Sequence, residues 1–283
     1  MAEQVLVVDG VELCVEAFGS PDEPAVLLVA GGAQSMVWWE DDFCRLLADG
    51  GRYVVRYDHR DTGRSTSSPA GRPSYSATEF GTDPLRILDA LHVPSAHLVG
   101  LSMGGGIAQV LAVTRPERVR TLTLLSTTAG PSHGEALPGP APRVAATFTT
   151  PDPEPDWSDR DAVVQYRVEA ERPYAGTLGF DEARVRRLAA REVDRTRDMA
   201  ASMTNHFLLD DDVPPIDPAR IAAPTLVLHG TADPLFPVEH GRALARVVPG
   251  AQLVELPGVG HEQPPPQRWD IAVPAILSHT AQR

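Results

Sequence analysis

The strongest structural signal in this chain is the stretch Ala96-His97-Leu98-Val99-Gly100-Leu101-Ser102-Met103-Gly104. It joins an apolar run to a Gly-x-Ser-x-Gly pentapeptide, and the small residues at 105–112 that follow have a helical pattern. A strand, a sharp turn and a helix in this order place the serine hydroxyl at the exposed end of a sheet, in a nucleophile elbow. The flanking glycines leave room for such a strained turn. Ser102 is therefore predicted to be a catalytic nucleophile.

A serine nucleophile needs a general base, and the base needs an acid that orients it. On a sheet of this kind the three occur in the order serine, acid, histidine along the chain. Asp233 follows an apolar strand pattern at 224–228, and His261 follows another at 252–256. No clear acid follows the apolar run 121–125, which favours Asp233. Asp233 and His261 are the predicted partners of Ser102.

An oxyanion hole is the fourth expected component, because charge develops on the carbonyl oxygen during attack. Met103 directly follows the nucleophile and would donate one backbone N–H from the start of the predicted helix. The second donor is expected in the loop after an early central strand, predicted at 25–30. Gly32 lies in that loop, and the conformational freedom of glycine suits an inward-turned N–H. Gly32 and Met103 are the predicted oxyanion-hole residues.

These motifs resemble those of the α/β-hydrolase fold serine hydrolases. Four runs carry the resemblance: 57–65, 100–105, 229–233 and 258–261. Residues 56–66, together with 30–32 and 48–51, are similar to the anthracycline (aclacinomycin) methylesterases, which hydrolyse a methyl ester on an aromatic polyketide. Many family members carry His-Gly where this chain has Ala30-Gly31, and the methylesterase-like group also lacks that histidine. The resemblance implies esterase chemistry by Ser102, Asp233 and His261.

Apolar strand patterns alternate with helical patterns along most of the chain, which is typical of a mainly parallel sheet covered by helices. An antiparallel hairpin around Asp9-Gly10 is expected to open it. The predicted fold class is α/β, an α/β-hydrolase fold with a mostly parallel eight-stranded sheet. From Pro131 the strand pattern stops, and prolines precede charged helical stretches near 159–172 and 181–203. We predict a core at 1–130 and 216–283 and a helical cap at 131–215, inserted after strand six, that roofs the pocket.

Large apolar residues near the predicted oxyanion loop and cap are candidates for substrate binding, because ligand pockets have mainly apolar walls with a few polar anchors. They suggest an apolar or aromatic substrate. Trp39 is expected instead to pack in the core beneath the first helix. The predicted substrate-binding residues are Gln34, Met36, Trp38, Phe207 and Phe236.

The net charge of −13 and the absence of a basic cluster argue against a nucleic-acid or anionic-membrane partner. The longest apolar runs are too short to span a bilayer, and we expect no secretory signal. Two cysteines give no disulfide framework and indicate a reducing cytoplasm. His229 and Asp233 lack a third ligand at metal spacing. We expect a cytoplasmic monomer or homodimer that acts on a small molecule without metal or cofactor.

The leading function is hydrolysis of a carboxylic ester, methyl esters included, through an acyl-enzyme. Perhydrolase or cofactor-free haloperoxidase-type activity and lactone, thioester or C–C bond hydrolysis use the same triad, so the sequence leaves them open. A dehalogenase or epoxide hydrolase of this fold would carry Asp where this chain has Ser102. A ligand-binding protein that turns over slowly is the alternative from a different class.

Overall fold

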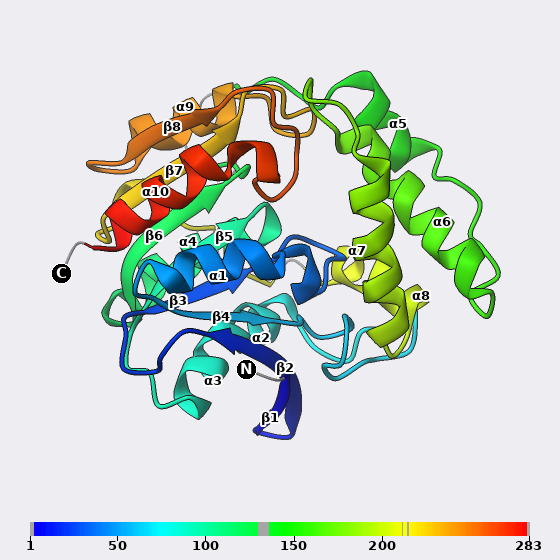
Figure 1. Ribbon diagram of the computed structural model, residues 1–283, viewed down its shortest axis with the longest axis horizontal. Coiled ribbons are helices and arrows are strands. Elements are labelled where there is room, and N and C mark those ends of the chain that lie inside the picture. Colours follow the sequence, from blue (N-terminus) through cyan, green and yellow to red (C-terminus); the bar gives the residue numbers. More distant parts are fainter. Residues whose placement is uncertain (1–2, 130–135, 211, 214, 282–283) are drawn as a thin grey trace.

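The computed structural model describes residues 3–129, 136–210, 212–213 and 215–281. Its centre is an eight-stranded sheet in the order β1-β2-β4-β3-β5-β6-β7-β8 (Figure 1). β1–β2 and β2–β4 are antiparallel, and the remaining pairs are parallel. The predicted fold class is confirmed. The strands are β1 (Gln4–Val8), β2 (Val11–Phe18), β3 (Ala25–Val29), β4 (Tyr53–Tyr57), β5 (Ala96–Leu101), β6 (Val119–Leu125), β7 (Thr225–Gly230) and β8 (Gln252–Leu256).

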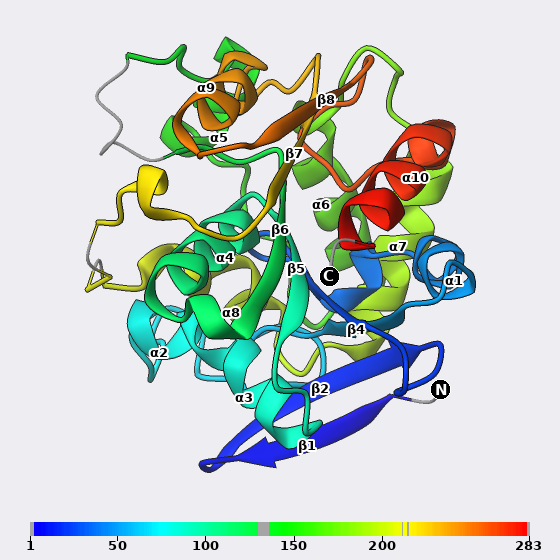
Figure 2. The same cartoon turned by 90° about the vertical axis from the view of Figure 1, so that its left-hand side faces the viewer.

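Helices cover both faces of the sheet because the central strands are apolar on both sides. In β3, Leu27 and Val29 belong to one buried cluster, whereas Val26 and Leu28 belong to the other. Figure 2 shows the sheet nearly edge-on between the two helical layers. The first face carries α2 (Ala77–Gly81), α3 (Asp83–Ala90), α4 (Met103–Thr114) and α9 (Glu239–Val247), and the second carries α1 (Asp41–Asp49) and α10 (Trp269–Thr280).

Local chemistry explains the ends of several elements. Asp9 and Gly10 have φ values of 51° and 79°, which suit the two-residue turn of the predicted opening hairpin. Residues 77–90 form two helices, α2 and α3, which are divided at Thr82. Pro84 lies in the first turn of α3 and has no N–H to donate to a preceding turn, so a continuous helix is interrupted there.

The chain between β6 and β7 forms a second helical region, which we call the insertion (described residues 136–210). Its helices are α5 (Pro142–Thr149), α6 (Arg160–Glu171), α7 (Glu182–Arg195) and α8 (Met199–Thr204). They gather at one side of the molecule, at the right in Figure 1. α5 lies in the proline-rich stretch that precedes the charged helical stretches. Pro142 is tolerated because it occupies the first turn of that helix.

The predicted helix 181–203 is two helices, α7 and α8. Asp198 separates them, and its side chain accepts a hydrogen bond from the Ala201 N–H, which caps the start of α8. The predicted cap also includes residues 131–135, 211 and 214, which lie outside the described residues. Within the described ranges, no helix is both long enough and apolar enough to cross a membrane.

Candidate active site

Ser102 lies at the turn between β5 and α4, in a backbone conformation that side chains rarely adopt. Its φ is 52° and its ψ is −118°. The turn brings backbone segments together so closely that a Cβ on Gly100 would lie 2.4 Å from the Gly104 carbonyl oxygen. A Cβ on Gly104 would lie 2.4 Å from the Val29 carbonyl oxygen. The two glycines therefore permit the strained conformation at Ser102, which costs on the order of 1–3 kcal/mol.

The loops after β5, β7 and β8 bring the three predicted polar side chains together. His261 Nε2 is 2.9 Å from Ser102 Oγ, and His261 Nδ1 is 2.9 Å from Asp233 Oδ2. Asp233 Oδ1 accepts the backbone N–H groups of Leu235 and Phe236, each at 2.9 Å. With the Nδ1 proton directed at the carboxylate, Nε2 is left to accept the serine proton. The geometry is that of an activated hydroxyl nucleophile.

Asp233 is buried yet remains ionised. Burial raises the pKa of Asp233. The electrostatic interaction and hydrogen bond with His261, together with His229 and the Phe236 N–H, lower this pKa by more than burial raises it, so the net shift is downward. His229 Nε2 lies 3.6 Å from Asp233 Oδ2 and 2.7 Å from the Phe236 carbonyl oxygen. Burial holds the pKa of His229 below its usual value although Asp233 opposes this. A neutral His229 thus stabilises the loop that carries Asp233 through its hydrogen bond to the Phe236 carbonyl oxygen. The spacing of residues in the sequence did not indicate this contact.

A cavity of about 480 Å³ adjoins Ser102 and His261. Gly32 and Met103, the predicted oxyanion-hole residues, both line it. Met103 is the first residue of α4, and the first N–H groups of a helix have no partner within the helix. The positive end of the helix dipole also favours negative charge at this point. The cavity therefore offers backbone donors and a positive potential beside the serine hydroxyl.

Comparison with known proteins identifies the family. Residues 24–264 match the family model of the α/β hydrolase fold. The chain belongs to this family. It is 33% identical to rhodomycin D methylesterase DauP of Streptomyces sp. (strain C5), over 99% of this chain and 98% of that protein. Rhodomycin D methylesterase DnrP of Streptomyces peucetius is 32% identical over the same shares.

Solved α/β hydrolase fold structures resemble the chain over its whole length. A hydrolase from Pseudomonas aeruginosa PA01 superposes with a TM-score of 0.71 at 28% identity, covering 98% of this chain and 97% of that one. The enol-lactonase of Burkholderia xenovorans LB400 gives a TM-score of 0.74 at 24% identity, covering 98% and 100%. The second likeness shows the fold alone.

Two of the five predicted substrate-binding residues, Gln34 and Phe207, line the cavity beside Ser102 in this α/β hydrolase. Phe236 is not among its lining residues, although its ring centroid lies 5.5 Å from that of His261. Met36 and Trp38 do not line the cavity either, which corrects the prediction. Both belong to the 3₁₀ turn η1 (Met36–Trp38), which directs their side chains into the protein interior.

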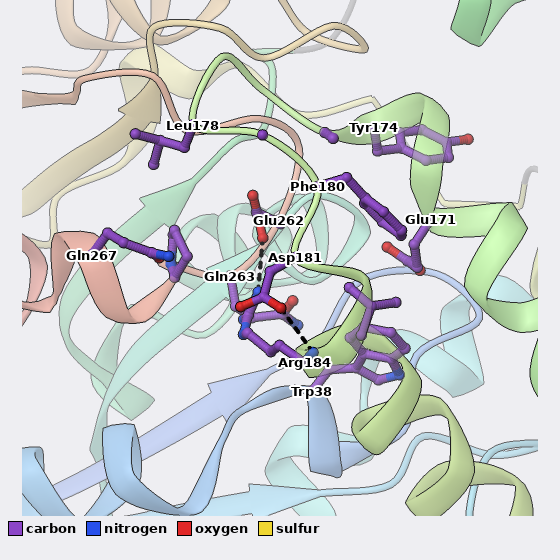
Figure 3. Close-up of a pocket in the computed structure, with 14 residues that line it drawn as sticks. Trp38, Glu171, Tyr174, Leu178, Phe180, Asp181, Arg184, Glu262, Gln263 and Gln267 are labelled. Carbon is purple, nitrogen blue, oxygen red and sulfur yellow. Dashed lines mark hydrogen bonds and ion pairs between the residues drawn. The ribbon is translucent and has the colours of Figure 1, made fainter.

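Trp38 contacts the insertion instead of the cavity. Its Nε1–H donates to Glu192 at 2.9 Å, and the Arg167 guanidinium lies 4.5 Å from its ring centroid. Trp38 also lines a second, much smaller cavity of about 40 Å³, shown in Figure 3. There Arg184 pairs with Glu262 at 3.1 Å. This space suits water rather than an organic molecule. The cavity beside Ser102 is the candidate substrate site of this α/β hydrolase because Ser102 and His261 line it.

Further cavity residues come from the insertion and carried no signal in the sequence. They share no motif and stand on different helices and turns, so only the folded chain brings them together. They are Thr147, Phe148, Arg167, Tyr174 and Met203. Over the described part of this α/β hydrolase, no group of three or more His, Cys, Asp or Glu side chains is arranged to hold a metal ion.

Proposed function

We propose that this protein is a serine hydrolase that cleaves a carboxylic ester through an acyl-enzyme. Membership of the α/β hydrolase fold family and full-length similarity to two methylesterases indicate a hydrolase that acts on ester bonds. The observation that carries the proposal is the hydrogen-bond chain from Ser102 Oγ through His261 to Asp233, with 2.9 Å at each link. It is the arrangement that makes a serine hydroxyl nucleophilic.

In the first step, Ser102 Oγ attacks the ester carbonyl carbon while its proton passes to His261 Nε2. The carbonyl oxygen becomes an oxyanion, which accepts hydrogen bonds from the Gly32 and Met103 N–H groups. As the tetrahedral intermediate collapses, the bond to the leaving oxygen breaks and His261 protonates the departing alcohol. Each oxyanion donor contributes on the order of 3–4 kcal/mol to stabilising this transition state.

In the second step, water replaces the alcohol. His261 Nε2 takes a proton from the water as its oxygen attacks the acyl carbon, and then returns a proton to Ser102 Oγ as the carboxylic acid leaves. Asp233 remains a carboxylate throughout; it fixes the tautomer of His261 and stabilises the imidazolium that forms in each step. The depressed pKa of Asp233 fits this role.

The cavity points to an apolar substrate. Aromatic and aliphatic side chains of the core and the insertion line it, among them Leu101, Phe148, Met203 and Phe207. An aromatic small molecule agrees with these walls. A methyl ester as the bond that is cleaved agrees with the names of the two methylesterase relatives. In this proposal residues 131–215 are a cap over a core of residues 1–130 and 216–283, and the protein needs no metal or cofactor.

Active-site labelling tests the nucleophile. The protein would be incubated with a fluorophosphonate, the adduct located by peptide mass spectrometry, and turnover of p-nitrophenyl acetate and butyrate measured in parallel. We expect one adduct, on Ser102, with turnover of both esters. Ser102→Ala should lose both signals, while Ser278→Ala, on the exposed face of α10, should keep both.

The outcomes separate the alternatives. Stoichiometric adduct without turnover would favour the slow ligand-binding protein, and no adduct on a folded protein would refute the assignment of Ser102. Comparison of an aromatic methyl ester with a lactone and a C–C bond substrate then ranks the reactions that share this triad.

A further inference from the structure

The β3–η1 loop (residues 30–35), which carries Gly32, is held by side chains from distant parts of the chain. The Ala33 N–H donates to His206 Nδ1 at 3.0 Å, and the Ser35 N–H donates to Glu192 Oε1 at 2.8 Å. Both acceptors belong to the insertion. Ala33 has a φ of 55°, which is uncommon for a residue with a side chain. A strained conformation of this kind persists only where surrounding contacts impose it.

His206 accepts from the loop in one defined protonation state. Its Nε2 lies 2.7 Å from the Arg60 carbonyl oxygen, which can only accept, while the Ala33 N–H can only donate. The ring must therefore carry its proton on Nε2 and keep the lone pair on Nδ1. Burial lowers the pKa of His206, against the opposing effects of the Arg60 carbonyl and Asp61, so the neutral form is maintained.

Glu192 gathers three donors at the base of the same loop. Its Oε1 accepts from the Ser35 N–H and from Trp38 Nε1, and its Oε2 accepts from Arg167 Nε at 2.7 Å. Glu192 and Arg167 are 0% and 2% exposed. Arg167 Nη2 also reaches the Ala33 carbonyl oxygen at 3.4 Å. The insertion thus contacts both the N–H and the carbonyl group of Ala33.

We propose that His206 and Glu192 are positioning residues for the oxyanion hole. By fixing the peptide groups of Ala33 and Ser35, they set the orientation of the adjoining Gly32 N–H beside Ser102. The inference rests on the proposed ester hydrolysis and extends it: the insertion helps to build the catalytic geometry as well as to cover the substrate. Both residues act through the loop and not on the substrate itself, because neither of them lines the cavity beside Ser102.

A matched pair of variants at His206 tests this. His206→Phe keeps a ring against Phe80 and His59 but removes the acceptor for the Ala33 N–H. His206→Asn loses the ring but places an amide oxygen close to the former Nδ1 position. Because small displacements of catalytic groups cost up to about 100-fold in rate, we expect His206→Phe to lower kcat by roughly 10- to 100-fold with KM little changed. His206→Asn should recover most of that loss.

The control is His279→Phe, which replaces a buried histidine at the end of α10 that bonds the Leu122 carbonyl. His279→Phe should lower the free energy of unfolding but should not lower kcat selectively, as His206→Phe is expected to do. The inference is overturned if His206→Phe retains wild-type kcat, if its effect is a change in KM, if His206→Asn is equally impaired, or if His279→Phe gives the same loss of kcat.

Fluorophosphonate labelling of Ser102 in the wild type separates the two proposals. A wild type without adduct or turnover would overturn the proposed function and this inference with it.

Discussion

The strand-end loops of the core and the helices of the insertion contribute to one site in different ways. The core supplies Ser102, which directly follows β5, and Asp233 and His261, which lie in the loops after β7 and β8. The insertion supplies cavity walls such as Phe207 and the buried groups that hold the β3–η1 loop. The nucleophile elbow therefore depends mainly on local structure, whereas the surroundings of the site depend on long-range packing. The His261 loop shares both, because the His261 N–H donates to the Tyr174 carbonyl oxygen of the insertion at 2.9 Å.

This difference has a consequence for how the two regions tolerate change. A strand-end loop on a parallel sheet is positioned by a ladder of backbone hydrogen bonds that is largely independent of side-chain identity. The position of the β3–η1 loop depends on individual side chains, such as Glu192 and His206, because their atoms accept its N–H groups. Substitutions in the core site should change chemistry without unfolding the protein, and substitutions in the buried part of the insertion should affect both.

The largest effect is expected from Ser102→Ala. Removing the nucleophile of a serine hydrolase costs about 10⁶-fold in kcat, because only binding and the oxyanion donors remain. Ser102 is an elbow residue whose side chain contributes little packing, so the urea unfolding midpoint should stay near that of the wild type. Steady-state turnover of p-nitrophenyl butyrate checks the rate. Residual activity above about 1% would show that the core loops do not supply the reacting group.

Asp233→Asn should follow, with a loss of about 10⁴-fold in kcat. The amide cannot stabilise the imidazolium and favours the wrong tautomer of His261, while the N–H groups of Leu235 and Phe236 still find an oxygen acceptor. The fold should therefore survive, as judged by circular dichroism. A loss smaller than about tenfold would indicate that another acid orients His261 and that the loop after β7 does not supply a catalytic residue.

The sequence predicts the strand-end loops of the core better than it predicts the contacts of the insertion. The elbow, the opening hairpin and the fold class are encoded by neighbouring residues, so patterns of glycine and apolar residues indicate them. Met36 and Trp38 were misplaced because spacing within a loop does not determine where side chains point. The contacts of Glu192 and His206 with the β3–η1 loop could not be predicted, because the two residues lie 157 and 173 positions from their loop partners, beyond any local pattern.

Glu192→Gln tests whether the insertion is a structural part of the core site. The amide oxygen can still accept from Ser35 and Trp38, but Arg167 loses a buried ion-pair partner. Breaking such a pair costs about 3 kcal/mol in the free energy of unfolding, measured by urea denaturation. Glu169→Gln, which removes a partly exposed charge on α6, is the control and should leave the midpoint unchanged. Equal midpoints for both variants would show that the buried pair does not stabilise the insertion.

The smallest effect is expected from Phe207→Ala, at a position where the insertion contributes only a cavity wall. The ring is 68% exposed, so the free energy of unfolding should change by no more than about 0.5 kcal/mol. Its edge would lie 3.2 Å from a Cβ on Gly32, which places the ring against this predicted oxyanion-hole residue. KM for an aromatic ester should rise about fivefold, as expected when about 1 kcal/mol of apolar contact is lost, while KM for p-nitrophenyl acetate changes less. Leu208→Ala, at a neighbouring exposed side chain that does not line this cavity, should leave both KM values unchanged. An equal rise in KM for both esters would mean that Phe207 shapes the site and does not contact the larger substrate. Phe207 would then be a residue that positions the β3–η1 loop, like His206 and Glu192.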